Sequence, residues 1–145
     1  MDGSWTVRWE RNRDDPNSGD CARDTRTGRK VAVKRIANIF DDDVDAKRML
    51  REIIIARHLR SVGTAIVRLT DVVQPAARVE DAKDLYLVFE MMESDLYKVI
   101  QSPQYLTELH VQSILYQLMC GIKFIHSAGV IHRDIKPSNV LIDQD

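Results

Sequence analysis

The sequence has little of the material from which covalent or metal-linked frameworks are built. It contains only two cysteines, Cys21 and Cys120, which lie far apart and lack the short spacing of metal ligands. Its four histidines, at positions 58, 110, 126 and 132, do not form a ligand set either. A disulfide framework or a zinc site therefore has little support, and a reducing compartment is the default expectation.

Excess positive charge and long apolar runs are also lacking. The 21 basic and 22 acidic residues give a formal net charge of -1, which provides no basic field for nucleic acid or anionic lipid. No apolar run is long enough to cross a bilayer. The first residues include Asp2, Arg8 and Glu10 in place of the apolar core of a signal peptide. We therefore expect no nucleic-acid partner, no membrane partner and an intracellular location.

The remaining composition is ordinary for a globular protein, with 145 residues of which 44% are hydrophobic and 30% charged. Residues 1–20 show no periodicity and contain a turn signal at 15–19, so we expect a divergent or flexible N-terminal arm. Trp5, Val7 and Trp9 alternate within this arm, which leaves a short strand open as an alternative.

Chemically useful residues are concentrated in one stretch, Ile-His-Arg-Asp-Ile-Lys-Pro-Ser-Asn-Val-Leu at 131–141. Asp134 and Asn139 are five residues apart, so the carboxylate can receive a proton from a hydroxyl while the amide oxygen reaches a metal ion. Lys136 lies between them and supplies positive charge, and Pro137 stiffens the backbone. This combination is typical of a loop that transfers a phosphoryl group; the alternative is an ordinary polar loop.

Two short runs, 21–26 and 30–36, predict a β-hairpin. In the second run Ala32 and Lys34 share one face of the strand. The small Ala32 leaves room for a flat ring, and Lys34 lies about 6 to 7 Å further along, where it could reach the phosphates of the same ligand. Taken alone, this strand is more simply read as one with a solvent-facing lysine, but the loop at 131–141 favours the functional interpretation.

A helix is predicted after the acidic residues 41–43 and is expected to close at Gly63. Its apolar residues recur at helical spacing, and Glu52 lies beside this stripe. Glu52 could therefore turn toward the strand and pair with Lys34, although on its own it would be a surface charge. The residues of the stripe are Ala46, Met49, Leu50, Ile53 and Ile54.

Further elements follow in order along the chain. Runs 66–73 and 85–91 are rich in apolar, β-branched and aromatic residues, which predicts two strands. Thr107 is a plausible N-cap for a long helix that ends near Gly129, and Met119 and Cys120 are interpreted as packing residues of its apolar side. The helical stripe itself, expected to be core, comprises Val111, Ile114, Leu115, Leu118, Ile122 and Ile125. Short extended pieces are expected at 130–131 and 140–142.

The stretch 131–141 resembles the catalytic loop of protein kinases, His-Arg-Asp followed by Asn at the required offset. Residues 85–100, Leu-Tyr-Leu-Val-Phe-Glu-Met-Met-Glu-Ser-Asp-Leu-Tyr-Lys-Val-Ile, resemble the interlobe hinge of mitogen-activated protein kinases, and residues 38–53 resemble their bridging helix. The resemblance implies an α+β protein-kinase-like fold. We expect a small antiparallel β N-lobe with a bridging helix at 21–93, followed at 94–145 by the beginning of a mostly helical C-lobe.

The same resemblance implies roles for individual residues around the transferred phosphoryl group. Lys34 would hold the α and β phosphates of ATP, and Glu52 would orient Lys34. Asp134 would accept or steer the substrate hydroxyl, Lys136 would stabilise the moving phosphoryl group, and Asn139 would bind Mg²⁺.

The adenosine part of the nucleotide would be held near the hinge. By resemblance, Phe89 guards the back of the adenine pocket. The Glu90 carbonyl and the Met92 amide would hydrogen-bond the adenine edge, and Asp95 would meet the ribose. Backbone groups suffice for this recognition, so the local side chains can be apolar.

The implied function is that of a Ser/Thr protein kinase of mitogen-activated protein kinase type. It would transfer the γ-phosphoryl group of ATP, with Mg²⁺, to Ser or Thr hydroxyls of a protein substrate. The family further implies control by an upstream kinase and a cytoplasmic or nuclear location, or both.

The sequence departs from the family pattern at two places. No G-x-G-x-x-G precedes the lysine strand, since Gly19 and Gly28 are the only glycines between Gly3 and Lys34. The sequence also stops at Asp145 before any Asp-Phe-Gly, which would supply the second metal carboxylate. We therefore expect an incomplete kinase domain with negligible activity as 145 residues alone. The alternatives are a truncated pseudokinase that binds nucleotide or a partner kinase, and a non-catalytic interaction domain that docks through helix 108–128.

Overall fold

The computed structural model describes residues 20–59, 65–74 and 83–143. The chain divides into two compact units. The sheet unit comprises Met1–Ile54 and Arg68–Met91, and the helical unit comprises Ile55–Val67 and Met92–Asp145. The N-terminal arm, with its possible strand at 5–9, and the helix-closing Gly63 lie outside the described residues.

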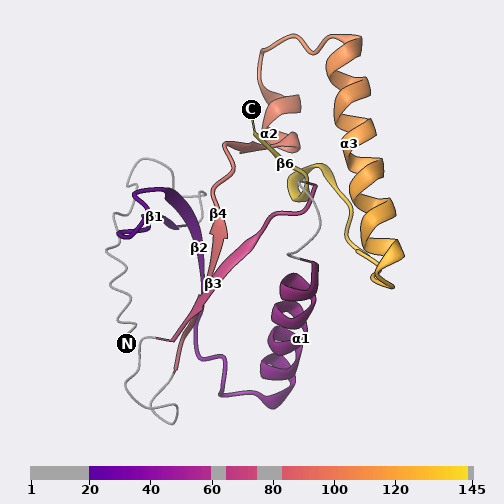
Figure 1. The fold of residues 1–145 in the computed structure, drawn as a ribbon. Coiled ribbons are helices and arrows are strands. Elements are labelled where there is room, and N and C mark those ends of the chain that lie inside the picture. The colour runs from indigo at the N-terminus through magenta and orange to yellow at the C-terminus, as the bar shows by residue number, and fades with distance from the viewer. Residues whose placement is uncertain (1–19, 60–64, 75–82, 144–145) are drawn as a thin grey trace. The chain divides into compact units, whose positions relative to one another are not determined.

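The sheet unit contains a four-stranded antiparallel sheet in the order β1-β2-β4-β3 (Figure 1). Its strands are β1 (Asp20–Arg23), β2 (Lys30–Ile36), β3 (Leu69–Val73) and β4 (Leu85–Glu90). The expected hairpin is confirmed as β1 and β2, and the two later strands are present as β3 and β4. β3 begins three residues later than expected, and its pairing with β4 shifts register between Leu69 and Asp71.

The first strand ends at Arg23, earlier than the expected 26, because the next residue caps a turn. The Asp24 carboxylate accepts hydrogen bonds from the Arg26 amide at 2.9 Å and from the Thr27 hydroxyl at 2.7 Å. Gly28 then adopts a left-handed backbone with φ of 72°, which glycine tolerates without steric cost. The local side-chain bonds of Asp24 thus replace the strand ladder with a turn.

The predicted alternation along β2 is present. Val31 and Val33 are buried and form a cluster with Ala22 and Val88, whereas Lys34 on the other face is exposed. Leu87, on the same face as its ladder partner Lys34, is the most deeply buried large side chain among the described residues, with 1% of its surface exposed. Each face of the sheet therefore carries its own buried layer.

Helix α1 (Asp43–Leu59) begins with acidic residues and ends with Arg57 and His58, which complements the helix dipole as the sequence predicted. Asp42 caps its start by accepting a hydrogen bond from the Val44 amide at 2.6 Å. Within the part of α1 that belongs to the sheet unit, residues 43–54, no residue is buried. The apolar stripe therefore does not form a fully buried seam, and Leu50 and Ile54 are each 57% exposed.

The helical unit contains several short elements and one long helix. Its elements are β5 (Ser94–Asp95), α2 (Leu96–Gln101), α3 (Glu108–Ser127), a 3-10 helix at Pro137–Asn139 and β6 (Leu141–Ile142). β5 and β6 pair antiparallel. The expected extended piece at 140–142 is thus largely confirmed as β6, whereas residues 130–131 form no strand.

Helix α3 begins where the sequence predicted, but the residues expected to form its buried stripe are mostly not buried. Thr107 is the N-cap, its hydroxyl accepting from the His110 amide at 3.2 Å. However, Ile125 is the only buried residue of the predicted core stripe. Interpreting Met119 and Cys120 as packing residues was wrong, because both are exposed. Among the described residues, no helix combines the length and apolar character needed to cross a membrane.

Candidate active site

Lys34 and Glu52 form the ion pair that the sequence suggested. Lys34 Nζ donates a hydrogen bond to Glu52 Oε1 at 3.1 Å, linking the middle of β2 to α1 within the sheet unit. The two side chains are about half exposed, at 53% and 47%. An exposed pair of this kind contributes little to folding, roughly 0 to 1 kcal/mol. Its significance is geometric, since it fixes the direction of a lysine that remains open to a ligand.

The sheet brings Ala32 and Phe89 together directly. They are cross-strand partners in the β2–β4 ladder, and Lys34 pairs with Leu87 two positions along. Directly opposed residues share a face of the sheet, so Ala32, Phe89 and Lys34 all lie on one side. Both Ala32 and Phe89 are half-buried. This face thus offers an apolar patch beside the ammonium group of Lys34.

Glu90 ends β4 and is tied to the segment before β3. Its amide donates to the Arg68 carbonyl at 3.1 Å, and its Oε1 accepts from the Arg68 amide at 2.7 Å. These bonds use the Glu90 amide and carboxylate and hold the backbone at the end of the strand. Met92, two residues on, belongs to the helical unit and is half-buried.

Asp95 has a structural task that the sequence did not reveal. It is the N-cap of α2, with Oδ1 accepting from the Lys98 amide at 2.9 Å. Lys98 Nζ also lies 3.9 Å from Oδ2. The side chain that was expected to meet a ribose is therefore already engaged by the first turn of a helix.

Asp134, Lys136 and Asn139 gather in one cluster of the helical unit. Lys136 Nζ lies 3.0 Å from Asp134 Oδ2, and Asn139 Nδ2 donates to the same oxygen at 2.9 Å. Asn139 Nδ2 also donates to the Asp134 carbonyl at 2.8 Å. Both side-chain contacts fall on Oδ2, and no contact within the described residues falls on Oδ1.

The backbone of this loop is held by a short helix and a strand pair. The Asn139 amide donates to the Lys136 carbonyl at 2.9 Å, closing the 3-10 turn over Pro137. Immediately after it, the Leu96 amide donates to the Val140 carbonyl at 2.8 Å, next to the β5–β6 pair. The C-terminal end of the loop is therefore anchored to the start of α2.

Arg133 and His132, which precede Asp134, each shape the backbone of the loop locally. Arg133 is exposed and has a left-handed backbone with φ of 68°, which few residues other than glycine adopt. His132 Nδ1 accepts a hydrogen bond from the Asp134 amide at 3.3 Å. The turn at Arg133 thereby directs the Asp134 carboxylate toward Lys136 and Asn139.

The cluster lowers the pKa of Asp134. The main cause is the hydrogen bond from Lys136, and the second is the hydrogen bond from Asn139. Both contacts stabilise the ionised carboxylate. Asp134 carries a negative charge at neutral pH, which strengthens the hydrogen bonds that its oxygens accept.

The residues present fit a magnesium–nucleotide group only in part. Nδ2 of Asn139 faces Asp134, so the amide oxygen Oδ1 is available as a hard oxygen ligand of the kind Mg²⁺ prefers. No group of three or more His, Cys, Asp or Glu suited to a metal occurs within residues 20–59, 65–74 and 83–143. Within the described residues, Asn139 can thus contribute one oxygen ligand to such a group.

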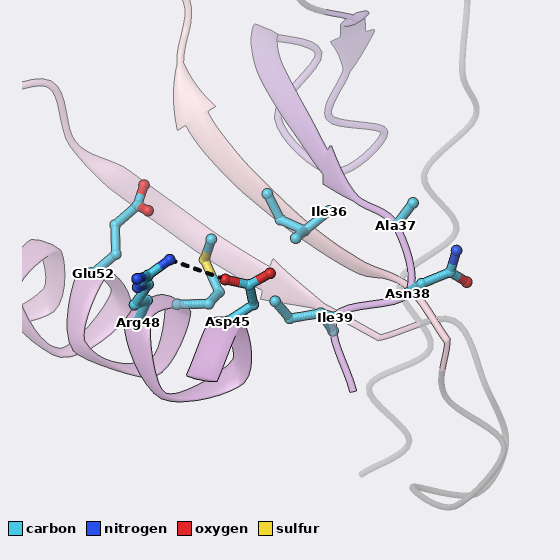
Figure 2. Close-up of a pocket in the computed structure, with 8 residues that line it drawn as sticks. Ile36, Ala37, Asn38, Ile39, Asp45, Arg48 and Glu52 are labelled. Carbon is cyan, nitrogen blue, oxygen red and sulfur yellow. Dashed lines mark hydrogen bonds and ion pairs between the residues drawn. The ribbon is translucent and has the colours of Figure 1, made fainter. Parts of the chain in front are cut away.

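The sheet unit also contains a small pocket that the sequence did not suggest (Figure 2). It has a volume of about 220 Å³ and lies between residues 36–39 and one side of α1, where Asp45, Arg48, Met49 and Glu52 line it. Arg35, which precedes the lining residue Ile36, forms an ion pair with Asp84, with Oδ2 2.6 Å from one guanidinium nitrogen. No sequence pattern links Arg35 with Asp84, because they are 49 residues apart.

The candidate residues therefore fall into separate groups. Lys34 with Glu52, and Ala32 with Phe89, are brought together in the sheet unit. The cluster around Asp134 belongs to the helical unit. A lysine–glutamate pair that links a strand to a helix, and a loop that carries an Asp and an Asn, are two of the parts found in protein kinases.

Comparison with known proteins agrees with this arrangement. The protein kinase domain family matches residues 18–145, so the chain belongs to the protein kinase family. Within that family the chain is similar to mitogen-activated protein kinases, which confirms the resemblance seen in the sequence. It is 50% identical over 120 residues to mitogen-activated protein kinase 4a of Physcomitrium patens, covering 83% of this chain and 31% of that protein.

Two further relatives come from distant organisms. Mitogen-activated protein kinase 5 of Arabidopsis thaliana is 45% identical over 124 residues, 86% of this chain and 32% of the relative. Extracellular signal-regulated kinase 1 of Dictyostelium discoideum is 45% identical over 124 residues, 86% of this chain and 23% of the relative. The chain thus spans at most about a third of the length of these relatives.

Proposed function

We propose that these residues belong to a Ser/Thr protein kinase of mitogen-activated protein kinase type, which transfers the γ-phosphoryl group of ATP to protein hydroxyls. The observation that carries the proposal is the cluster in which Lys136 and Asn139 both contact Asp134 Oδ2, at 3.0 and 2.9 Å. Both contacts stabilise the ionised form of the carboxylate, and its other oxygen, Oδ1, would face the substrate hydroxyl.

The work of Asp134 would be to accept a hydrogen bond from the substrate hydroxyl and align it. Its lowered pKa suits alignment better than full removal of the proton early in the reaction. Lys136 would hold positive charge beside the transferred group, where negative charge has to be stabilised. The side chains of this loop are exposed, with Asp134 at 64%, which suits a protein substrate that approaches from solvent.

The nucleotide side of the proposal rests on Lys34. With Glu52 fixing its direction, Lys34 would bind the α and β phosphates, while Ala32 and Phe89 on the same sheet face would contact the adenine ring. Glu90 and Met92 would bind the adenine edge through their backbone groups. Asp95 is the least supported member, because its carboxylate already caps α2.

Mg²⁺ would supply charge neutralisation of the phosphates when bound. Asn139 would hold the ion through Oδ1, since its Nδ2 is committed to Asp134. The Asp134 contacts fix the rotamer of this amide, so the ligand oxygen is presented without rearrangement.

The wider proposal follows the family. Residues 21–93 would form the N-lobe and 94–145 the first part of the C-lobe. A protein substrate, activation by an upstream kinase, and a cytoplasmic or nuclear location would accompany the activity. The names of the relatives support these assignments at the level of the family.

The nucleotide site is tested by ATP binding to the 145-residue chain, measured by calorimetry with and without Mg²⁺. We expect Mg²⁺-dependent binding that weakens at least about tenfold in Lys34→Met, since a charge contact to phosphate is lost. Lys30→Met, which removes an exposed lysine from the same strand, is the matched control and should bind as the wild type does.

The outcomes separate the alternatives. If Lys34→Met and the wild type bind ATP with equal affinity, Lys34 does not contact the nucleotide. Absence of any ATP binding would favour the non-catalytic interaction domain. Binding that depends on Lys34 supports the site, and transfer by the intact protein then distinguishes a kinase from a pseudokinase.

A further inference from the structure

Asp84 holds the segment that connects β2 to α1. Its Oδ2 accepts from Arg35 Nε at 2.9 Å and lies 2.6 Å from a second guanidinium nitrogen. Its Oδ1 accepts from the Asn38 amide at 3.2 Å. Both carboxylate oxygens are therefore engaged, and the Asp84 side chain is only 18% exposed.

The contact continues into the neighbouring residues. The Ile39 amide donates to the Lys83 carbonyl at 3.0 Å, and Ile39 is buried, with 5% of its surface exposed. The last rung of the β2–β4 ladder is Ile36 with Leu85. Residues 83–84 thus continue the hydrogen bonding between the two segments beyond the end of the ladder.

The held segment makes a sharp turn. Asn38 has φ of 52°, in the left-handed region that asparagine tolerates better than most residues. The Asp41 amide donates to the Asn38 carbonyl at 3.1 Å, and α1 begins two residues later, at Asp43. The point at which α1 leaves the sheet is therefore set only a few residues from Asp84.

Packing within the sheet unit does little to fix α1 independently. No residue of its first part, 43–54, is buried. Figure 2 shows the pocket that separates this side of α1 from residues 36–39. With a pocket in place of a packed seam, the position of the helix depends on its tether at the N-terminal end and on the Glu52 pair.

We propose that Asp84 is a positioning residue, which holds Arg35 and Asn38 so that α1 presents Glu52 to Lys34. The inference rests on the proposed nucleotide role of Lys34. Asp84 acts on Lys34 and Glu52 through the connecting segment. It is not itself a proposed nucleotide contact. The Asp84 contacts with Arg35 and Asn38 thus hold the segment that connects β2 to α1, and the contact between Lys34 and Glu52 depends on them.

The test measures the Lys34–Glu52 pair directly in the 145-residue chain. In the pair, Lys34 Nζ donates a hydrogen bond to Glu52, so the nitrogen is held by its partner, and we expect an N-hydroxysuccinimide ester to acylate Lys34 more slowly when the pair is intact. Mass spectrometry gives the acylation rate of each lysine. In Asp84→Ala we expect the Lys34 rate to rise about two- to fivefold, the range that corresponds to an exposed ion pair, with a smaller rise in Asp84→Asn.

A double-mutant cycle separates positioning from general loosening. Glu52→Gln should raise the Lys34 rate by itself, and Asp84→Ala should add nothing further in that background. Asp45→Asn is the control, since it removes an ion pair with Arg48 from the same helix and should leave the Lys34 rate unchanged. The acylation rates of Lys30 and Lys98 report unfolding, because unfolding raises the acylation rates of all lysines together. If Asp84→Ala proves to be unfolded, the Lys34 rate in Asp84→Asn tests the inference.

An unchanged Lys34 rate in folded Asp84 variants would overturn the inference, as would a rise of equal size in the Glu52→Gln background. The acylation rates need no nucleotide. Failure of the wild type to bind ATP would therefore count against the proposed function alone. If ATP does bind, Asp84→Ala should weaken its affinity and Asp45→Asn should not.

Discussion

Asn139 holds Asp134 at two points, donating from one amide nitrogen to the Asp134 carbonyl at 2.8 Å and to Oδ2 at 2.9 Å. Lys136 approaches the same Oδ2 at 3.0 Å. The carboxylate is thus fixed by side chains from its own loop. Because all three residues lie within six positions of one another, the geometry belongs to the loop itself.

The first prediction concerns the pKa of Asp134. Lys136 is the main cause of its lowering, so Lys136→Met should raise the pKa toward the ordinary value of 3.8. Asn139→Ala should raise it as well, through the second cause. A carbon-13 NMR titration of the carboxyl group measures the shift. Lys123→Met, an exposed lysine on α3, is the control; no change in Lys136→Met would contradict the assignment.

Asp24 gives a prediction for the pH dependence of stability. Its pKa is lowered, mainly by the Thr27 hydroxyl and then by the Arg26 amide. A carboxylate with a lowered folded pKa stabilises the fold above its unfolded pKa, and this contribution is lost as the pH falls through the folded value. Asp24→Asn should therefore lower the free energy of unfolding at pH 7.

The difference between Asp24→Asn and the wild type should shrink as the pH falls below about 4. Urea unfolding at several pH values measures it. Thr27→Val, which removes the hydroxyl donor, should reduce the same pH dependence. If the difference in the free energy of unfolding stays constant across the pH range, the charge of Asp24 does not contribute to stability.

Thr107 should stabilise α3 through its cap. Thr107→Ala removes the acceptor for the His110 amide and should lower the free energy of unfolding by about 0.5 to 2 kcal/mol. Thr107→Ser keeps a hydroxyl and serves as the control. Chemical unfolding followed by circular dichroism measures both variants, and equal losses in the two would argue against a capping role.

Leu87 should be the most sensitive core position of the sheet. It is 1% exposed, and Leu→Ala at such a site costs about 2 to 5 kcal/mol from lost burial and the cavity left behind. Leu50→Ala, at a position that is 57% exposed on α1, should cost less than about 1 kcal/mol. Similar losses at the two positions would mean that the buried layer under Lys34 does not stabilise the sheet as its core.

Local patterns in the sequence predicted the parts of the fold that local interactions determine. The hairpin, the alternation at Val31 and Val33, and the Thr107 cap each depend on residues close in sequence. The spacing of Asp134, Lys136 and Asn139 likewise predicted their cluster, since a span of six residues limits their separation.

Long-range contacts and burial were not predictable in the same way. Asp84 and Arg35 are 49 residues apart, and neither belongs to a motif, so their pairing required the register of β2 and β4. The helical period of α3 predicted a helix correctly, but Met119 and Cys120 are exposed. A period shows which residues share a face, whereas burial depends on what lies against that face.

The most direct test of the account is phosphoryl transfer that depends on Asp134. Because the chain spans about a third of its relatives' length, the assay uses the protein translated from the complete reading frame, with γ-labelled ATP, Mg²⁺ and a protein rich in Ser and Thr. Asp134→Asn should lower the rate at least about a hundredfold, while Asp143→Asn, an exposed carboxylate of the same region, should leave it unchanged. Transfer at the wild-type rate in Asp134→Asn would contradict the account.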